Sequence, residues 1–556
     1  MERALKDLAR RHGPLATVVR YGTSHEGRPL LAMEATDRST GSAGEKPGVA
    51  LIAGIQGDEA GASEVALRVL QRLLESHGTD PAGTDLLRTR AIWVVPRANP
   101  DGIERLFGKA PQLHRHLLAP LDDDSDEEID EDGPQDVDGD GLVLQMRLRD
   151  PQGPWRADAS DPRLLVRAKP GEQGEFRLLP EGRDQDGDGM VAEDGPGGTD
   201  LNRNFPALWQ WRTTQPGAGP FMASAEETRA LMDFLLARPS IGLVCVLHGS
   251  GRQPFYPAGR LGASLASDDK ALLERMGRLW EQATGRKIAT PATTPGDPGA
   301  GSLLDWVCLH FGALAHSPEI WSPPAAPAKS GADASPPAQP LNREDGRVAS
   351  ASQRAPRGAA GQAPSGGQAN GSEDAGAAGE ERAWLAWNDR ELGGTGFVAW
   401  KPFRHPDLGE VEIGGWKPFT RDNPPAGKLE EMAEKEHRFF VQFALQSPRV
   451  RIHEAVAEPA APGAWRVRLT AVNEGATPTA CSQGVLSRTT RPVLGILALS
   501  EGAKILAGVP RVKMGQMGPQ ERKTVEWIVA APAGARLRIT LDAQRGGVET
   551  REVVPH

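Results

Sequence analysis

The sequence predicts an α/β fold, with a mixed, largely parallel sheet flanked by helices, followed by a C-terminal β-sandwich. Residues 1–321 alternate short apolar runs, typical of buried strands, with segments of helical periodicity. From residue 448 onward the pattern changes to short alternating strands separated by turns, which is typical of a small sandwich. At 556 residues the chain is long enough for more than one domain.

The elements of the first region can be placed in order. Residues 1–15 are charged and amphipathic and predict a helix. Apolar residues recur on one face of a second predicted helix, Ala60–Ser76. Gln56, Asn99 and His248 each follow a predicted strand, where open α/β sheets gather their sites. The predicted strands are Val49–Ile55, Ala91–Pro96, Ile241–Leu247 and Ala313–Ile320.

The α/β domain is predicted over 1–321 and, after an interruption, over 383–447, where a helix runs from about Lys428 to Gln446. Residues 322–382 consist mainly of Ala, Pro, Gly, Ser and Gln, without an aromatic residue. Such a segment cannot bury enough apolar surface to offset its ordering entropy, so we predict a disordered insertion. Residues 448–556 form the predicted sandwich.

The composition argues against nucleic acid as the main partner and against a membrane span. The chain carries 64 Lys and Arg against 74 Asp and Glu, a net charge of −10, whereas nucleic-acid binding needs a basic face. No apolar run approaches the length of a membrane span. Three widely spaced cysteines, Cys245, Cys308 and Cys481, predict no disulfide framework.

Two acidic loops within 121–195 share one spacing and predict calcium sites. Carboxylates at alternate positions followed by glycine suit Ca²⁺, which takes six to eight oxygen ligands. A looser acidic run, 122–132, raises the expected number of structural ions to between one and three. The alternative is a solvated acidic insertion. The predicted ligands are Asp136, Asp138 and Asp140 in the first loop, and Asp184, Asp186 and Asp188 in the second.

The expected location depends on the N-terminus. The first helix lacks the apolar core of a signal peptide, so the chain as written predicts a cytoplasmic protein. The calcium loops favour export, because cytosolic Ca²⁺ is too low for weak sites. A start codon placed too far downstream would reconcile the two, with a secreted or periplasmic protein.

Five short motifs follow one another along the α/β region. They are 56-QGDE-59, 96-PRANPDG-102, 200-DLNRNFP-206, 247-LHGSG-251 and 316-HSPEIW-321. Each is weak alone: a histidine after a strand is more often structural than a ligand, and Asn-Pro-Asp-Gly alone predicts a turn. In this order and spacing they resemble the zinc carboxypeptidase family, over residues 1–321 and 383–447. The acidic loops and 405-HPDLGEVEIGG-415 resemble a bacterial subgroup of that family.

The resemblance implies a metallocarboxypeptidase that removes the C-terminal residue of peptides or proteins. It implies that Glu59 and His248 bind zinc. Gln56 stands where the family has a histidine as the remaining protein ligand. Glu319 matches the general base, which takes a proton from the attacking water.

The resemblance also implies how substrate is held. Asn202 and Arg203 match the pair that binds the terminal carboxylate, a task that suits a planar guanidinium. Arg147 is the expected arginine that polarises the scissile carbonyl, with Arg149 as its rival. Leu304 lies at the position of a specificity-pocket residue, which predicts an apolar C-terminal side chain.

Gln56 leaves several states of the zinc site open. A glutamine offers a neutral carbonyl oxygen, whereas zinc prefers imidazole or thiolate, so we expect weaker zinc binding. The site could hold zinc through Gln56, Glu59 and His248; it could recruit His25 or His316; or it could be empty. An empty site would leave a protein that binds peptide C-termini without hydrolysing them. A further alternative is a calcium-braced adhesion or scaffold protein whose sandwich binds the partner.

Overall fold

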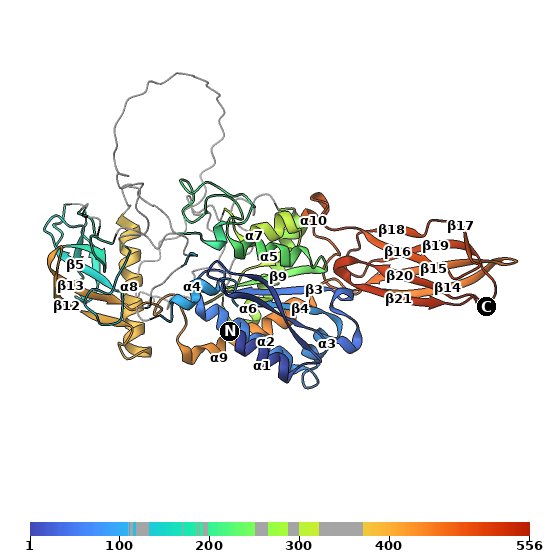
Figure 1. Cartoon of the computed structure of the whole chain (residues 1–556), viewed down its shortest axis with the longest axis horizontal. Helices are drawn as coiled ribbons and strands as arrows, with labels where there is room; N and C mark the ends of the chain where they lie inside the picture. Colours follow the sequence, from blue (N-terminus) through green and yellow to red (C-terminus); the bar gives the residue numbers. More distant parts are fainter. Residues whose placement is uncertain are drawn as a thin grey trace, which may run out of the picture.

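The computed structural model describes residues 1–108, 111, 115–117, 133–169, 171–185, 187, 189–192, 198–250, 265–286, 300–321 and 371–555. Figure 1 shows a central α/β domain with a small β-sheet at one end and a two-sheet domain at the other. Of the predicted disordered insertion, 322–370 lies outside the described residues. The predicted boundary at residue 383 is wrong, because a helix already begins at Gly371.

The central sheet has seven strands in the order β1-β2-β4-β3-β9-β10, with β11 also pairing with β9. β3 lies parallel to β4 and β9, and β10 and β11 lie parallel to β9, whereas β1 and β2 are antiparallel. This confirms the mixed, largely parallel sheet. The strands are β1 Ala16–Thr23, β2 Pro29–Ala35, β3 Gly48–Ala53, β4 Ala91–Val95, β9 Ile241–Ser250, β10 Leu314–His316 and β11 Glu319–Trp321.

Helices cover both faces of this sheet and create two apolar cores. One core contains side chains of α1 (Glu2–Arg11), α2 (Ala60–Ser76), α3 (Pro81–Thr89), α6 (Ser267–Thr284) and α9 (Leu429–Leu445). The other contains α5 (Glu226–Leu236), α7 (Leu303–Trp306) and the π-helix η4 (Val307–Phe311). The predicted helix Ala60–Ser76 coincides with α2, and α9 lies within the predicted 428–446.

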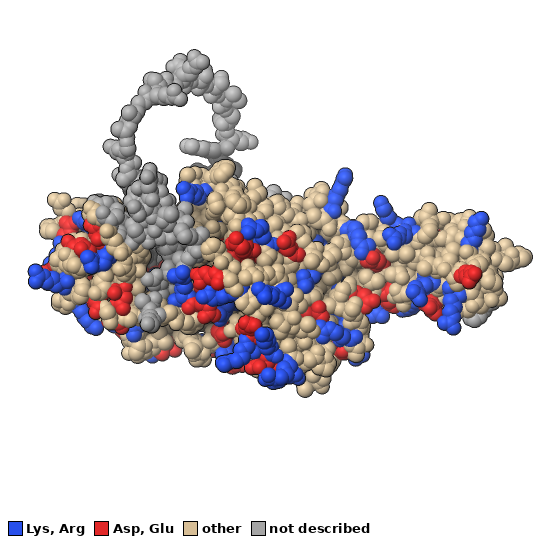
Figure 2. Space-filling model, viewed as in Figure 1, with Lys and Arg blue, Asp and Glu red and all other residues tan. Residues whose placement is uncertain are grey.

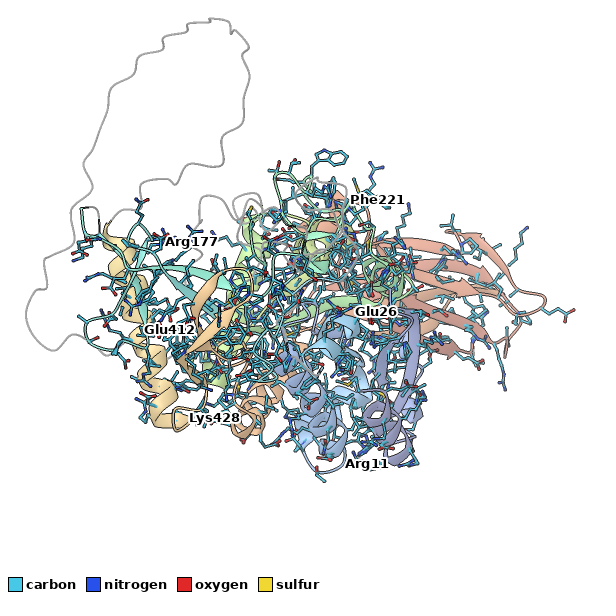
Figure 3. The ribbon with its side chains drawn as sticks, turned by 60° about the vertical axis from the view of Figure 1, so that its left-hand side comes forward. Arg11, Glu26, Arg177, Phe221, Glu412 and Lys428 are labelled. Atoms are coloured by element: carbon cyan, nitrogen blue, oxygen red, sulfur yellow. The ribbon has the colours of Figure 1, made fainter. Side chains whose placement is uncertain are left out.

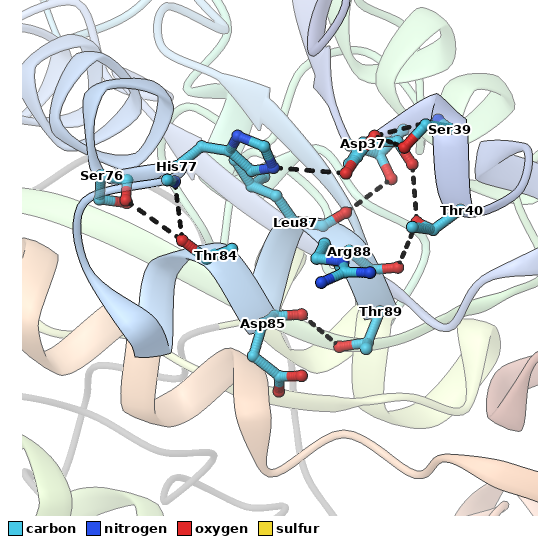
Figure 4. A network of polar contacts seen from close by, with 12 residues as sticks. Asp37, Ser39, Thr40, Ser76, His77, Thr84, Asp85, Leu87, Arg88 and Thr89 are labelled. Atoms are coloured by element: carbon cyan, nitrogen blue, oxygen red, sulfur yellow. Dashed lines mark hydrogen bonds and ion pairs between the residues drawn. The ribbon is translucent and has the colours of Figure 1, made fainter.

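A polar network fixes the loop after β2 to the turn between α2 and α3 (Figure 4). His77 Nε2 lies 3.3 Å from Asp37 Oδ2, and Thr40 Oγ1 donates to the Arg88 carbonyl at 2.6 Å. Short 3₁₀ turns, η1 Arg38–Thr40 and η2 Ala43–Glu45, complete this region. The network borders an interdomain groove of about 920 Å³ between the α/β domain and the C-terminal domain.

The second sheet joins two distant parts of the chain. Its order is β12-β13-β5-β8-β6-β7, so the acidic insertion pairs with a hairpin from the predicted 383–447 segment. That hairpin therefore belongs to the small sheet and not to the α/β sheet. Helix α8 (Gly371–Glu391) packs beside it. The strands are β5 Gln145–Arg149, β6 Trp155–Ala157, β7 Leu165–Arg167, β8 Phe176–Pro180, β12 Phe397–His405 and β13 Gly409–Trp416.

The C-terminal domain is a β-sandwich, as predicted. Two four-stranded sheets, β14-β15-β19-β17 and β18-β16-β20-β21, enclose one apolar core that includes Trp527 and Leu541. Helix α10 (Ser482–Leu486) and the 3₁₀ turn η6 (Gln544–Gly546) connect strands. The strands are β14 Val450–Ala461, β15 Ala464–Asn473, β16 Val493–Ala498, β17 Lys504–Ala507, β18 Arg511–Gly515, β19 Arg522–Ala530, β20 Leu537–Asp542 and β21 Val548–Val553.

Charges are mixed over the visible surface. Figure 2 shows Lys and Arg interspersed with Asp and Glu across the face drawn. Within the described ranges, no helix combines the length and the apolar character that a membrane crossing requires. Cys245, Cys308 and Cys481 are buried free thiols.

Candidate functional site

Three adjacent parallel strands bring the candidate residues to one edge of the central sheet. Gln56 and Glu59 lie on the turn after β3, His248 lies on β9, and Glu319 begins β11. Glu319 is the register partner of His248 across the β9–β11 pair. Gly54 enables the turn: its φ is +59°, and a Cβ there would lie 2.9 Å from Ile103 Cδ1. These side chains therefore lie together at the strand ends, as the alternation of strands and helices predicts.

Glu59 and His248 face each other directly. Glu59 Oε1 lies 2.8 Å from His248 Nδ1 and also accepts the Gly249 N–H at 3.1 Å. Glu59 Oε2 is buried and has no hydrogen-bond partner within the described part of the chain. Burial alone would lower the pKa of His248, but the carboxylates of Glu59 and Glu319 raise it. An unsatisfied buried carboxylate oxygen is costly, and a cation would satisfy it.

Gln56 is oriented by Asp200. Its side chain is buried, at 3% exposure, and its amide Nε2 donates to Asp200 Oδ2 at 3.2 Å. The nitrogen is thereby committed, which leaves the carbonyl Oε1 as the atom available to a cation. Metal-binding histidines commonly hold a carboxylate with their second nitrogen, and Gln56 makes the same kind of contact.

Arg115 also belongs to this site. Its Nε donates to the same Asp200 oxygen at 3.1 Å, and its side chain is 49% exposed. Burial would lower the pKa of Arg115, but Asp200, Asp58 and Glu59 raise it. Burial and the neighbouring Glu59 raise the pKa of Asp58. A half-exposed guanidinium thus stands beside the carboxylates of the turn.

The predicted carboxylate-binding pair is built onto the next loop. Asp200 caps the 3₁₀ turn η3 (Leu201–Arg203) by accepting the Asn202 N–H at 2.8 Å. Asn202 Oδ1 accepts the Leu303 N–H at 3.0 Å, which ties it to the start of α7. Burial raises the pKa of Asp305 to about 6, although Ser302 and Arg203 oppose this. The structure therefore brings Asn202 and Arg203 to the helix that carries Leu304.

Arg147 does not join this group. It lies on β5 of the small sheet, where its Nε donates to Glu412 at 2.8 Å and its guanidinium lies 4.7 Å from the ring centres of Phe176 and Trp400. Figure 3 places Glu412 in the left-hand lobe, whereas Glu26 lies in the central domain. Arg149, the rival, lies on the same strand, 5.6 Å from the Phe176 ring centre.

Sequence reasoning missed Arg115. The available signal was its place in the chain: it follows the Asn-Pro-Asp-Gly turn and precedes the acidic insertion, whereas Arg147 lies beyond that insertion. The two histidines considered as substitutes for Gln56 have other neighbours, although neither ring nitrogen of His316 has a hydrogen-bond partner among the described residues. His316 is buried against Phe439, with ring centres 5.5 Å apart, and burial lowers its pKa to about 4. His25 Nδ1 lies 3.6 Å from Glu226.

The acidic loops share one conformation in their described parts. Asp136 accepts the N–H groups of Gly139 and Gly141, and Asp184 accepts those of Gly187 and Gly189. Ligand atoms of Asp136, Asp138 and Glu181 lie within 4.8 Å of one another, a group that could hold a cation. Asp140 is not in that group, and Glu181 was not predicted. Asp186, Asp188 and the run 122–132 lie outside the described residues.

The chain was compared with known proteins. A family model described as zinc carboxypeptidase matches residues 1–328, and a model of a domain of unknown function matches residues 449–554. Carboxypeptidase D of Mus musculus is 32% identical over 105 residues, which are 19% of this chain and 8% of that protein. Carboxypeptidase A2 of Rattus norvegicus is 40% identical over 88 residues, 16% of this chain and 20% of that protein. The matches thus span a fifth or less of these relatives.

Similar solved structures have low sequence identity. Thrombin activatable fibrinolysis inhibitor is 16% identical with a TM-score of 0.38, and the match covers 57% of this chain and 63% of that one. Carboxypeptidase A from Helicoverpa armigera is 18% identical with a TM-score of 0.37, and the match covers 57% and 62%.

Proposed function

Because the chain belongs to the zinc carboxypeptidase family, we propose that it is an active metallocarboxypeptidase that hydrolyses the C-terminal peptide bond of peptides or proteins. The observation that carries this proposal is the Glu59 carboxylate: Oε1 lies 2.8 Å from His248 Nδ1, and the buried Oε2 has no hydrogen-bond partner among the described residues. The same turn holds Gln56, whose Nε2 donates to Asp200. This arrangement is what a site for one metal ion requires.

The residues present fit zinc. Gln56 Oε1, Glu59 and His248 Nδ1 would hold the ion, leaving a position open to water, as in catalytic zinc sites. When bound, zinc lowers the pKa of that water and polarises the substrate carbonyl. Glu59 Oε1 and His248 Nδ1 lie 2.8 Å apart, so one ion could contact both.

The other residues take defined roles in this proposal. Glu319, across the β9–β11 pair from His248, accepts the proton of the attacking water and delivers it to the leaving amine. Asn202 and Arg203 bind the terminal carboxylate. Arg115, rather than Arg147, faces the developing oxyanion, because it is the guanidinium held beside Asp200.

The position of Leu304 supports a preference for apolar C-terminal residues. It is partly buried at the margin of an apolar core, on the helix that Asn202 holds. Asp305, next to it, is buried, and the charge of Arg203 favours its ionised form.

Gln56 favours one alternative: a protein that binds peptide C-termini without hydrolysis. Carbonyl oxygen is a weaker zinc ligand than imidazole. If the ion were absent, Asn202 and Arg203 would still bind a carboxylate.

Metal analysis separates the two. We expect the purified chain to hold about one zinc per molecule, and Gln56→His to hold it more tightly because imidazole is the better ligand. Elemental analysis after dialysis against a graded chelator measures both, with His248→Ala as the zinc-free control. Zinc found only in Gln56→His would make the binding protein the better proposal. In the enzyme, Glu319→Gln should abolish turnover and retain peptide binding.

We also propose that the first acidic loop binds Ca²⁺ through Asp136, Asp138 and Glu181. The like charges of Asp136 and Asp140 add to burial in raising the pKa of Asp138, and a cation would relieve this repulsion. The loop leads into β5, so the ion would brace the small sheet. It would not present Arg147 to substrate, since Arg147 is held within that sheet.

A further inference from the structure

Leu304 and Glu319 lie on one continuous segment of the chain. Helix α7 carries Leu304 and Asp305, continues as the π-helix η4, and ends at Gly312 with φ +71°. Strands β10 and β11 follow, and β11 begins with Glu319. The C-terminal carbonyl groups of such a helix have no partner within the helix, so they need donors from elsewhere.

The sandwich supplies those donors through Arg545. Arg545 lies on η6, is 4% exposed, and donates to the carbonyl oxygens of Phe311, at 2.7 Å, and of Gly312. Its guanidinium also lies 5.4 Å from the centre of the Phe311 ring. Burial lowers the pKa of Arg545 to about 10, so it remains charged at neutral pH. A cation at a helix C-terminus also opposes the negative end of the helix dipole.

A second part of the sandwich forms hydrogen bonds with the same turn. The Cys481 thiol donates to the Gly312 carbonyl at 3.0 Å, and Gln483 Nε2 donates to the Leu309 carbonyl at 3.4 Å. Asp269 of α6 accepts the N–H groups of Ser482 and Gln483, at 2.8 and 3.1 Å, and so holds the start of α10.

The fit at this contact leaves no free space. A Cβ on Gly312 would lie 2.1 Å from Thr489 Oγ1 and 2.8 Å from Gly484 Cα. The turn therefore touches the sandwich directly, and a larger residue would separate the two domains.

We propose that the C-terminal sandwich is an intramolecular brace of the active site, in which Arg545 and Cys481 fix the end of the α7–η4 helix. The brace holds Leu304 and Asp305 on one side of Gly312 and Glu319 on the other. This assigns a role to a domain whose family model carries none. The roles of Leu304 and Glu319 in it rest on the proposed function; the mechanical coupling does not.

Hydrogen exchange of the full-length chain tests the coupling without any need for activity. Arg545→Met keeps the aliphatic stem and removes the guanidinium. We expect amides of 303–316 to exchange roughly tenfold faster or more, because buried charge-assisted hydrogen bonds are lost, while the amides of β15 and β19 keep their parent rates. Arg545→Lys should restore part of the protection. Arg538→Met is the matched control, since Arg538 is exposed on β20 and pairs with Glu552.

Two results of the exchange experiment would contradict the brace. Unchanged exchange at 303–316 in Arg545→Met, or faster exchange confined to the sandwich strands, would overturn the brace. If Arg545→Met does not fold, Gln483→Ala and Cys481→Ala carry the same comparison, with the same two results against the proposal.

Turnover of a C-terminal dipeptide substrate adds a functional measurement. We expect Arg545→Met to raise KM and lower kcat together, with Arg545→Lys intermediate and Arg538→Met unchanged. If the parent is inactive, the proposed function fails, whereas the exchange result still decides the brace. If the parent is active and only melting temperature changes in Arg545→Met, the sandwich stabilises the chain without positioning its site.

Discussion

At the scale of single residues, Asp200 organises the site. One of its oxygens accepts from both Gln56 and Arg115, and the other caps the turn that carries Asn202 and Arg203. Glutamine suits this position better than most replacements for a metal-binding histidine. It keeps a nitrogen donor for Asp200 and an acceptor for the cation on one side chain. In the proposed site, Gln56 would be a weaker zinc ligand than histidine, held by the same kind of contact to a carboxylate.

Arg115 and Arg147 give opposite predictions. If Arg115 acts as proposed, Arg115→Met should lower kcat by about 10²–10³-fold, because it removes a donor to the developing oxyanion, with a smaller change in melting temperature. Arg147→Met should leave kcat near the parent value and lower the melting temperature, because Glu412 loses its partner in the small sheet. Steady-state kinetics and thermal unfolding of the two variants measure both effects. The assignment of Arg115 would be wrong if only Arg147→Met lost turnover.

At the scale of elements, local patterns predicted most of the α/β domain. The apolar runs before Gln56, before Asn99 and at His248 located β3, β4 and β9, because buried parallel strands need continuous apolar sequence. Helix α2 was predicted residue for residue from its periodicity. Once these strands are parallel neighbours, the meeting of their terminal side chains follows.

The position of Arg147 in the small sheet also has a physical reason. The contact that holds Arg147 joins it to Glu412, 265 residues later, across the β5–β13 pair. Nothing in the local sequence of either strand specifies that partner, since register between distant strands depends on the assembled sheet. The start of α8 was also not predicted, because the composition of 322–382 does not change where the helix begins. The buried tryptophans that anchor the helix, Trp384 and Trp387, follow residue 382.

Calcium removal should act on the small sheet. We expect EGTA to lower the melting temperature of the parent by several degrees, since an ion bound only to the folded state stabilises it. Asp138→Asn should abolish that difference, whereas Asp140→Asn, outside the cluster, should retain most of it. Differential scanning fluorimetry with and without added Ca²⁺ measures this. Equal responses of the two variants would argue against the ligand set Asp136, Asp138 and Glu181.

At the scale of the whole molecule, the small sheet and the sandwich lie at opposite ends of the central α/β domain (Figure 1). Long-range contacts join them: Asn423, which follows the small sheet, bonds Gly61 and Asp58 beside the turn, and Arg545 of the sandwich reaches the helix before Glu319. The global fold also buries ionisable groups far from solvent, and α9 carries one of them. Burial of such a group makes the stability of the entire chain depend on pH.

Glu436 on α9 is a buried carboxylic acid. It accepts the Trp280 Nε1–H at 3.1 Å, its Oε2 has no partner among the described residues, and burial raises its pKa from 4.5 to about 7. The folded chain therefore holds a proton that the unfolded chain releases between pH 4.5 and 7, so its contribution to stability falls as pH rises through that range. Glu436→Gln should remove this dependence and be the more stable protein above pH 7, by an amount on the order of 3 kcal/mol.

Denaturant unfolding of Glu436→Gln and its parent from pH 4.5 to 8 measures that difference, and Glu434→Gln, an exposed neighbour paired with Arg438, is the control. The two curves should approach each other toward the acidic end, where the unfolded state also begins to bind the proton, and diverge steadily toward pH 7. Parallel curves would mean that Glu436 is ionised in the folded chain and that Arg286, the nearby cation whose charge favours the carboxylate, compensates its burial. Convergence at low pH is the decisive feature, because a variant that only repacked the interior would shift stability equally at every pH.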